Sequence, residues 1–152
     1  VKSGAKINAI DCEGWNALHF ASQEGHLPII EYLVKSGADL NSINNNNGLT
    51  AFYLAGLRGH LPRGHLPVIK YLVQNGADIN STKDDGKTAL HIAAWEGHLP
   101  YLLQSGADVN STENHGLTAL HVAAQMGFLS IVKYLLQKEV DLDRMTNVFV
   151  NH

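Results

Sequence analysis

A nine-residue pattern recurs along the chain and constrains its fold more than any other feature. It occurs as Gly-Lys-Thr-Ala-Leu-His-Ile-Ala-Ala at 86–94 and returns in similar form at 116–124 and 14–22. A fourth copy, 48–56, keeps the Gly and the Thr-Ala but has Phe-Tyr in place of Leu-His. Four copies of one unit indicate a repeat protein, in which each unit buries its apolar side chains against its neighbours.

Further markers recur in phase with this pattern. Gly-Ala-Asp-apolar-Asn stands at 37–41, 76–80 and 106–110, and Gly-His-Leu-Pro opens an apolar stretch at 25–34. The unit measured from Gly4 to Gly37 is 33 residues long. We expect Thr88 and Thr118 to cap a short first helix, because a threonine hydroxyl accepts from the free N–H groups of a helix start. A second helix is predicted to begin at the Pro of each Gly-His-Leu-Pro and to end at the next Gly.

A period of 33 residues carrying Thr-x-Leu-His-x-Ala, Gly-His-Leu and Gly-Ala-Asp-x-Asn resembles the ankyrin repeat. Ala stands where that family usually has the Pro of Thr-Pro-Leu-His, which changes little because Ala favours helices. The resemblance covers nearly the whole chain. It implies an all-α solenoid of helix-turn-helix units joined by β-turn or hairpin-like loops. The predicted single domain, 1–152, comprises a partial repeat at 1–10, repeats at 11–43, 44–82, 83–112 and 113–143, and a C-terminal tail at 144–152.

Two repeats depart from the period. In the second, Arg-Gly-His-Leu-Pro at 58–62 is repeated at once at 63–67, and five extra residues within a helix would rotate its apolar face by about 140°. We therefore expect the insertion to loop out between two helices. The third repeat lacks three residues after Pro100, which predicts a shorter second helix with nearly the same face. The asparagine run 44–47 adds one residue to a turn.

The segment 1–10 reads as the end of a repeat whose helices lie outside this sequence. The first full repeat then lacks a neighbour, so we expect an exposed apolar edge there, and either a monomer or association through this edge. At the other end, Val148-Phe149-Val150 is expected to cover the last helix pair or to open another repeat.

Composition narrows the class of partner. The formal net charge is −3, which argues against nucleic acid, because phosphate binding requires clustered Lys and Arg. No apolar run approaches the length of about 18 residues that crosses a membrane, so no membrane partner is expected. A single cysteine, Cys12, allows no intrachain disulfide, and we expect a cytoplasmic or nuclear, reducing compartment.

Histidine is the residue that most suggests chemistry. His19, His91 and His121 share one repeat position, but successive repeats lie roughly 10 Å apart, too far for one metal ion. We expect these imidazoles to bond turn backbone and bridge neighbouring repeats. His26, His60, His65 and His98 share a second position. Cys12 is expected to be a free turn cysteine. No phosphate loop, dinucleotide fingerprint or catalytic pair is present, so the sequence predicts no cofactor, no metal and no enzyme.

The ankyrin resemblance implies a protein or peptide partner on the concave face, lined by turn tips and by the exposed side of the first helix. The positions that vary between the copies are those positions. Aromatic and apolar residues among them suit interface anchors, although Trp15 and Trp95 have the alternative of packing on neighbouring repeats. The acidic residues favour a partner with basic and apolar side chains. The predicted partner-binding residues are Trp15, Gln23, Glu24, Leu49, Leu57, Arg58, Asp84, Asp85, Lys87, Trp95, Glu96, Leu117, Gln125 and Met126.

Two other functions are compatible with the sequence. Repeats resembling these are substrates of an asparaginyl hydroxylase that acts on an Asn with a Leu eight residues earlier, a pattern met at Asn41, Asn80 and Asn110. The alternative is that these side chains only bond turn backbone. The repeats would also serve as the targeting module of a larger enzyme.

Overall fold

The computed structural model describes residues 4–57, 66–96 and 99–137, and the side chains of all of these except 94–96. These residues form helices joined by turns and contain no strand, which confirms the all-α prediction. The helices are α1 (Ala17–Glu24), α2 (Leu27–Lys35), α3 (Ala51–Leu57), α4 (Leu66–Gln74), α5 (Ala89–Glu96), α6 (Leu99–Gln104) and α7 (Ala119–Met126). Helical turns also cover 129–137.

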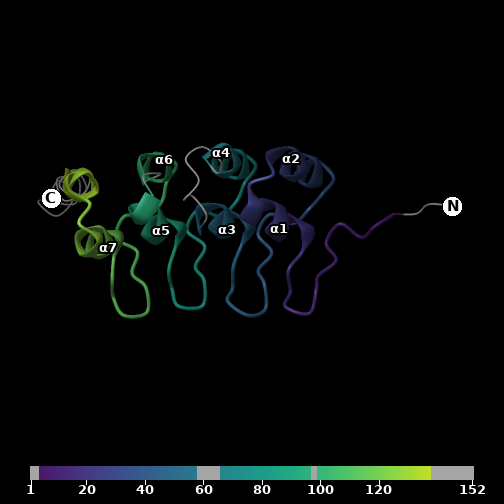
Figure 1. The fold of residues 1–152 in the computed structure, drawn as a ribbon, viewed down its shortest axis with the longest axis horizontal. Helices are drawn as coiled ribbons and strands as arrows, with labels where there is room; N and C mark the ends of the chain where they lie inside the picture. The colour runs from purple at the N-terminus through teal and green to yellow at the C-terminus, as the bar shows by residue number, and fades with distance from the viewer. Residues whose placement is uncertain (1–3, 58–65, 97–98, 138–152) are drawn as a thin grey trace, which may run out of the picture.

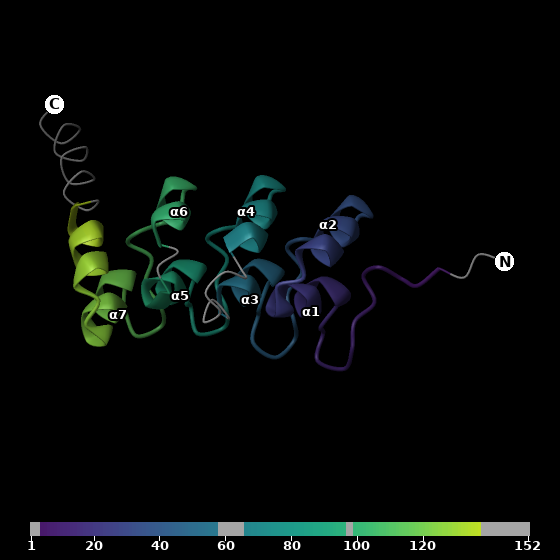
Figure 2. The ribbon, with the colours of Figure 1, turned by 45° about the horizontal axis from the view of Figure 1, so that its top comes forward.

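The helices form two rows along an elongated stack (Figure 1). The inner row contains α1, α3, α5 and α7, each packed on the next, and α2, α4 and α6 lie against their inner partners (Figure 2). The main contacts between these helices lie within a repeat or between adjacent repeats, so the core runs along the stack. This is the nearest-neighbour packing of a solenoid. Hairpin-like loops project from the inner row, and we call them fingers. In chain order the four fingers are closed by backbone bonds at 11–15, 44–49, 83–87 and 113–117.

The inner helices present apolar residues on more than one side. Leu18 and Ala21 of α1, and Leu90 and Ala93 of α5, are buried in the main core. Helix α1 begins with a reciprocal cap, in which Asn16 Oδ1 accepts from the N–H of His19 at 2.9 Å. The cap predicted at Thr118 is present as a capping box with His121, and a further hydroxyl cap forms in the second repeat, where Thr50 Oγ1 accepts from the N–H of Tyr53. The Thr88 hydroxyl differs from the prediction, because it lies against the His91 imidazole instead.

The outer helix of the third repeat is shorter than those of the first two, because this repeat lacks three residues. Helices α2 and α4 have nine residues, whereas α6 has six. Leu99 lies three residues before Leu102, as Ile69 lies three before Leu72, and all four side chains are buried. The shortened helix therefore loses about one turn at its start while Leu99 takes the place of the missing isoleucine. The prediction of a short helix with a preserved face is confirmed.

Helix α3 is described as far as Leu57, and α4 begins within the second copy of the duplicated pentapeptide, at Leu66, so the prediction that the insertion loops out falls on residues outside the described part. The conformation of 58–65 lies outside the described residues. So do the C-terminal tail 144–152 and the prediction made for Val148–Val150.

The first repeat exposes its N-terminal edge, which confirms that prediction. Phe20 and Ile29 are 49% and 51% exposed, whereas the equivalent Leu54 and Val68 of the second repeat are 1% and 0% exposed. The difference arises because the second repeat packs on α1 and α2, while the only described chain ahead of the first repeat is the segment from residue 4.

Candidate functional site

The fingers stack edge to edge and form one side of the candidate site. The N–H of Asn45 donates to the carbonyl of Glu13 at 2.9 Å. In the next pair, the N–H of Asp84 donates to Asn47 O, and further along Asn114 N donates to Asp85 O, both at 2.8 Å. These bonds use backbone atoms only, so the ladder holds the fingers in register and leaves the side chains at their tips to vary.

Each finger is also closed by a side chain at its base. In the first finger, Asp11 Oδ1 accepts from the N–H groups of Glu13 and Trp15. In the second finger, Asn44 Oδ1 accepts from the N–H groups of Asn47 and Leu49, and these bonds span the extra residue. Lys83 has no acceptor at this position. In that finger Asp85 takes over, since it accepts from Lys87 N and pairs with the Lys83 ammonium at 3.2 Å.

Glu113 closes the fourth finger. Its Oε1 accepts from the N–H groups of His115 and Leu117, and Oε2 lies 3.0 Å from His115 Nδ1. The hydrogen bond from His115, followed by that from the Leu117 backbone, holds the pKa of Glu113 below its ordinary value of 4.5. The buried carboxylate is thereby fixed as part of the scaffold.

The shared imidazoles bond turn backbone, as expected from the sequence, and the ring of His91 also bridges to the next repeat. His19 Nδ1 accepts from Asn16 N, and His19 Nε2 lies 3.0 Å from Ser42 O. His91 Nδ1 accepts from Thr88 N in the same way, but its Nε2 lies 2.9 Å from Leu117 O, which belongs to the next repeat. A backbone N–H can only donate and a carbonyl can only accept, so both rings are neutral with the proton on Nε2. Burial lowers the pKa of His19 below 6.5, although the carbonyls of Ser42 and Leu49 oppose this shift.

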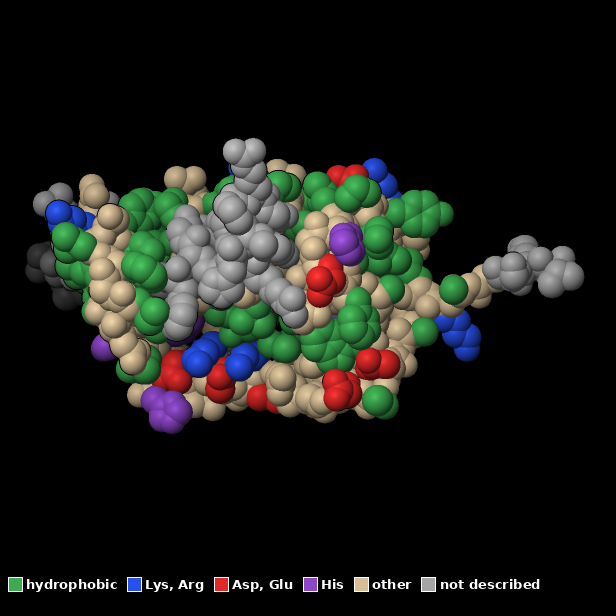
Figure 3. Space-filling view, in the orientation of Figure 1, with side chains coloured by type: hydrophobic (Ala, Val, Ile, Leu, Met, Phe, Trp, Pro, Cys, Tyr) green, Lys and Arg blue, Asp and Glu red, His purple; other side chains and the backbone are tan. Residues whose placement is uncertain are grey.

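A strip of apolar side chains lies where the fingers meet the inner helices. We call it the finger-base strip, and Figure 3 shows hydrophobic side chains at this level with charged side chains of the fingers beside them. Its centre is buried and its margins are partly accessible. The strip comprises Trp15, Leu49, Tyr53, Leu54 and Ile92, and so spans three repeats.

Trp15 forms the accessible end of this strip. It is half-buried, and its ring centroid lies 5.1 Å from that of the exposed Phe20. The packing interpretation of Trp15 is therefore confirmed, since it packs on the second repeat, while its role as an interface anchor stays a prediction. Leu49 differs from the sequence prediction of a solvent-facing anchor, because it is 6% exposed and belongs to the packing.

The other predicted binding residues differ in exposure. Exposed side chains at these positions are Glu24, Leu57, Asp84, Leu117 and Gln125. Half-buried ones are Gln23, Asp85, Lys87 and Met126. Arg58, and the side chains of Trp95 and Glu96, lie outside the described part of the structure. Phe20 and Tyr53 were not among the predicted residues. The prediction used positions that vary between the repeat copies, and these two residues stand at framework positions of the helix.

The proposed hydroxylation sites hold the ends of the repeats together. Asn41 Oδ1 accepts from Asp78 N at 2.9 Å, and Asn80 Oδ1 accepts from Asp108 N at the same distance. The two amide groups also lie 3.5 and 3.3 Å from the carbonyls of Gly76 and Gly106. All three asparagines are exposed. Hydroxylation of Asn41, Asn80 or Asn110 stays a prediction, which intact mass after treatment with such an enzyme would test.

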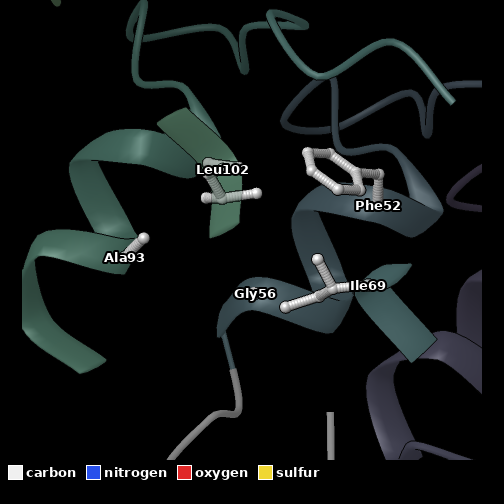
Figure 4. Close-up of a pocket in the computed structure, with 6 residues that line it drawn as sticks. Phe52, Gly56, Ile69, Ala93 and Leu102 are labelled. Carbon is white, nitrogen blue, oxygen red and sulfur yellow. The ribbon is translucent and has the colours of Figure 1, made fainter. Parts of the chain in front are cut away.

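A small apolar cavity lies between the second and third repeats (Figure 4). It has room for about 10 Å³, close to a single water molecule. Its lining is Phe52, Gly56, Ile69, Ala89, Ala93 and Leu102. With no polar group to orient a ligand, it is a packing defect beside the two irregular repeats rather than a binding site.

The described residues contain no group of three or more His, Cys, Asp or Glu side chains arranged to hold a metal ion. Cys12 is exposed and unpaired in its finger. No helix in the described ranges combines the length and apolar character needed to cross a membrane.

Comparison with known proteins agrees with the fold. The family model for ankyrin repeats in three copies matches residues 1–82 and 61–146. The human protein phosphatase 1 regulatory subunit 27 is 41% identical over 49 residues, which are 32% of this chain and 32% of that protein. The human Notch-regulated ankyrin repeat-containing protein is 37% identical over 54 residues, 36% of this chain and 46% of that protein.

A fungal relative has the same character. Ankyrin repeat protein nuc-2 of Neurospora crassa is 39% identical over 59 residues, which are 38% of this chain and 5% of that protein. The matched stretches thus span less than half of each of these relatives, so their individual activities do not transfer to this chain. The family model, however, covers most of the sequence in register with its repeats, and the chain belongs to the ankyrin repeat family.

Proposed function

We propose that this chain is a non-catalytic protein-interaction module that binds a peptide segment of its partner along the finger-base strip. The observation that carries the proposal is the strip itself. It combines a buried centre at Leu49 and Leu54 with an accessible aromatic end at Trp15, beside which lies the exposed ring of Phe20. A rigid aromatic anchor beside a packed apolar floor is typical of interface hot spots.

Charge favours a basic partner. Glu13 and Asp84 are exposed on the fingers that border the strip. The nearby lysines are already engaged, because both Lys83 and Lys87 pair with Asp85. The surplus charge beside the strip is therefore negative, and a peptide with apolar and basic side chains complements it.

The test uses an array of synthetic peptides that vary independently in net charge and in aromatic content. The wild-type chain is expected to prefer basic peptides with an aromatic or aliphatic residue. The variant Glu13→Gln/Asp84→Asn should lose the preference for basic peptides while keeping the apolar one. Neither carboxylate makes a hydrogen bond or ion pair within the described residues, so folding should be unaffected.

A matched control changes net charge equally but elsewhere. Gln74→Lys/Gln104→Lys places the same charge difference on exposed positions of the outer helices α4 and α6. This control should bind basic peptides as the wild type does. Equal loss in both variants would mean that only net charge matters, and no charge preference in the wild type would remove the basic-peptide proposal.

A further inference from the structure

The chain contains two Asn-Gly dipeptides in different structural settings. Asn47-Gly48 lies in the second finger, and Asn75-Gly76 follows the end of α4. Asn-Gly is a chemically labile dipeptide, because glycine has no Cβ to hinder attack of its backbone nitrogen on the preceding side-chain amide. We propose that Asn47 is a site of spontaneous deamidation and that the fold protects Asn75 from the same reaction.

At Asn47 neither reacting group makes a hydrogen bond within the described residues, although Gly48 itself is buried. In the other three fingers the glycine N–H donates to a carbonyl three residues earlier, as from Gly86 to Lys83 O at 2.9 Å. The N–H of Gly48 makes no such bond within the described residues, because the extra residue of this finger moves the closing pair to Asn44 and Leu49. The Asn47 side chain is exposed, and its amide has no partner among those residues either.

Both reacting groups are engaged at Asn75. The N–H of Gly76 donates to Val73 O at 3.2 Å, and Asn75 Nδ2 donates to Tyr71 O at 2.8 Å. The backbone N–H of Asn75 also donates to Tyr71 O. Attack at this site requires the end of the helix to open, whereas at Asn47 the backbone is held by two bonds, from Asp84 N to its carbonyl and from its own N–H to Asn44 Oδ1 at 3.3 Å.

The reaction is a substitution at the side-chain carbonyl carbon. The Gly48 nitrogen gives up its proton to hydroxide and bonds to Asn47 Cγ, and the bond from Cγ to the amide nitrogen breaks to release ammonia. Water then opens either carbon–nitrogen bond of the cyclic imide, leaving aspartate or isoaspartate. No oxidation occurs.

The product would alter the candidate binding face. A new carboxylate would stand close to Asp84, whose Oδ1 lies 2.6 Å from the place that a Cβ on Gly48 would occupy. Isoaspartate would also lengthen the backbone inside the pair in which Asn44 N donates to Leu49 O. The finger would thus gain negative charge and lose register as the protein ages, whether or not a partner binds.

The experiment follows both dipeptides in one sample. The full chain is incubated at mildly alkaline pH and digested, and the peptides containing residues 47 and 75 are quantified by mass spectrometry. Asn47 should convert at least about tenfold faster, since two further hydrogen bonds hold the reacting groups of Asn75. In concentrated urea the two rates should approach each other, because the protection belongs to the fold.

Controls separate the outcomes. Asn47→Gln should abolish the fast conversion and leave the Asn75 rate unchanged, because the longer side chain cyclises poorly. Similar rates at both sites in the native chain would overturn the proposal. So would an equally large difference in urea, which would assign the selectivity to local sequence.

Discussion

The Nε2 atom of His91 lies 2.9 Å from the carbonyl oxygen of Leu117, which belongs to the next repeat. On the other side of the ring, Nδ1 accepts from the N–H of Thr88 within its own repeat. The neutral imidazole therefore satisfies one donor and one acceptor on either side of a repeat boundary. This position couples the stability of adjacent repeats, which are also held by apolar packing, by the finger ladder and by the bonds of Asn41 and Asn80 to the following repeat.

Substitution of His91 by Leu should lower the free energy of unfolding by about 2 kcal/mol, because it leaves the buried Thr88 N–H without an acceptor. Urea unfolding followed by circular dichroism measures the loss. His121→Leu is the matched control, since the same position in the last repeat is exposed and bonds only Thr118 among the described residues. Equal losses in both variants would show that the bridge to Leu117 adds nothing.

A buried hydroxyl in α1 offers a stabilising change. Ser22 is buried, and its Oγ has no hydrogen-bond partner in the described structure. The third and fourth repeats carry Ala94 and Ala124 at this position. Ser22→Ala should raise the free energy of unfolding by about 1 kcal/mol, because it removes an unsatisfied polar group and improves helix propensity.

The urea midpoint should rise without a change in slope, since the surface exposed on unfolding stays the same. Ser22→Val is the companion variant, because it also lacks the hydroxyl but adds volume to a packed position. A loss of stability in the alanine variant would mean that the hydroxyl is solvated by a buried water.

A second stabilising substitution is expected at Gly56, where a methyl group should raise the free energy of unfolding. It lies within α3 and lines the apolar cavity, and a Cβ built on it meets no atom within 4 Å. Gly56→Ala should stabilise by about 1 kcal/mol, because alanine reduces the freedom of the unfolded chain and partly fills the space.

Gly48→Ala provides the opposite case. Its φ of +68° is unfavourable for alanine, and the new Cβ would lie 2.6 Å from Asp84 Oδ1. This variant should lose stability in the same urea measurement. If both substitutions stabilise the protein, the second finger contributes little to the folded state.

The fold follows from the sequence because its signals recur in phase. A helix shortened by three residues could be predicted with its buried face intact, since three residues are close to one turn and Leu99 supplies the side chain that Ile69 supplies one repeat earlier. The exposed edge at Phe20 and Ile29 was predictable for a similar reason, because a repeat without a neighbour leaves its packing face open.

The candidate site was less predictable. Comparison of the copies separates variable positions from framework positions, but exposure also depends on what the adjacent repeat supplies. Leu49 stands at a position that varies between the copies and is nevertheless buried, because it packs against Trp15 and Tyr53. Phe20 occupies a framework position and is nevertheless exposed, because its neighbour on one side is absent from the described residues.

The last prediction concerns pH. His19 bonds Asn16 N through Nδ1 and Ser42 O through Nε2, so protonation at Nδ1 would bring two donors together. Burial already holds the pKa of His19 below its ordinary value of 6.5. The unfolded chain therefore binds this proton at a higher pH than the folded chain does. The contribution of His19 to stability is complete above the ordinary pKa and is lost as pH falls through 6.5 toward the lower folded value.

Urea unfolding between about pH 7.5 and 5 should therefore show stability falling with pH, and the fall should be smaller in His19→Gln. Glutamine offers one acceptor and one donor but does not titrate, so the difference between the two slopes isolates His19. This window lies above that of Glu113, whose pKa is held below 4.5 and whose contribution is lost only at lower pH. Parallel slopes for the wild type and His19→Gln would show that the bridge to Ser42 tolerates the charged ring, and the linkage between His19 and folding would have to be abandoned.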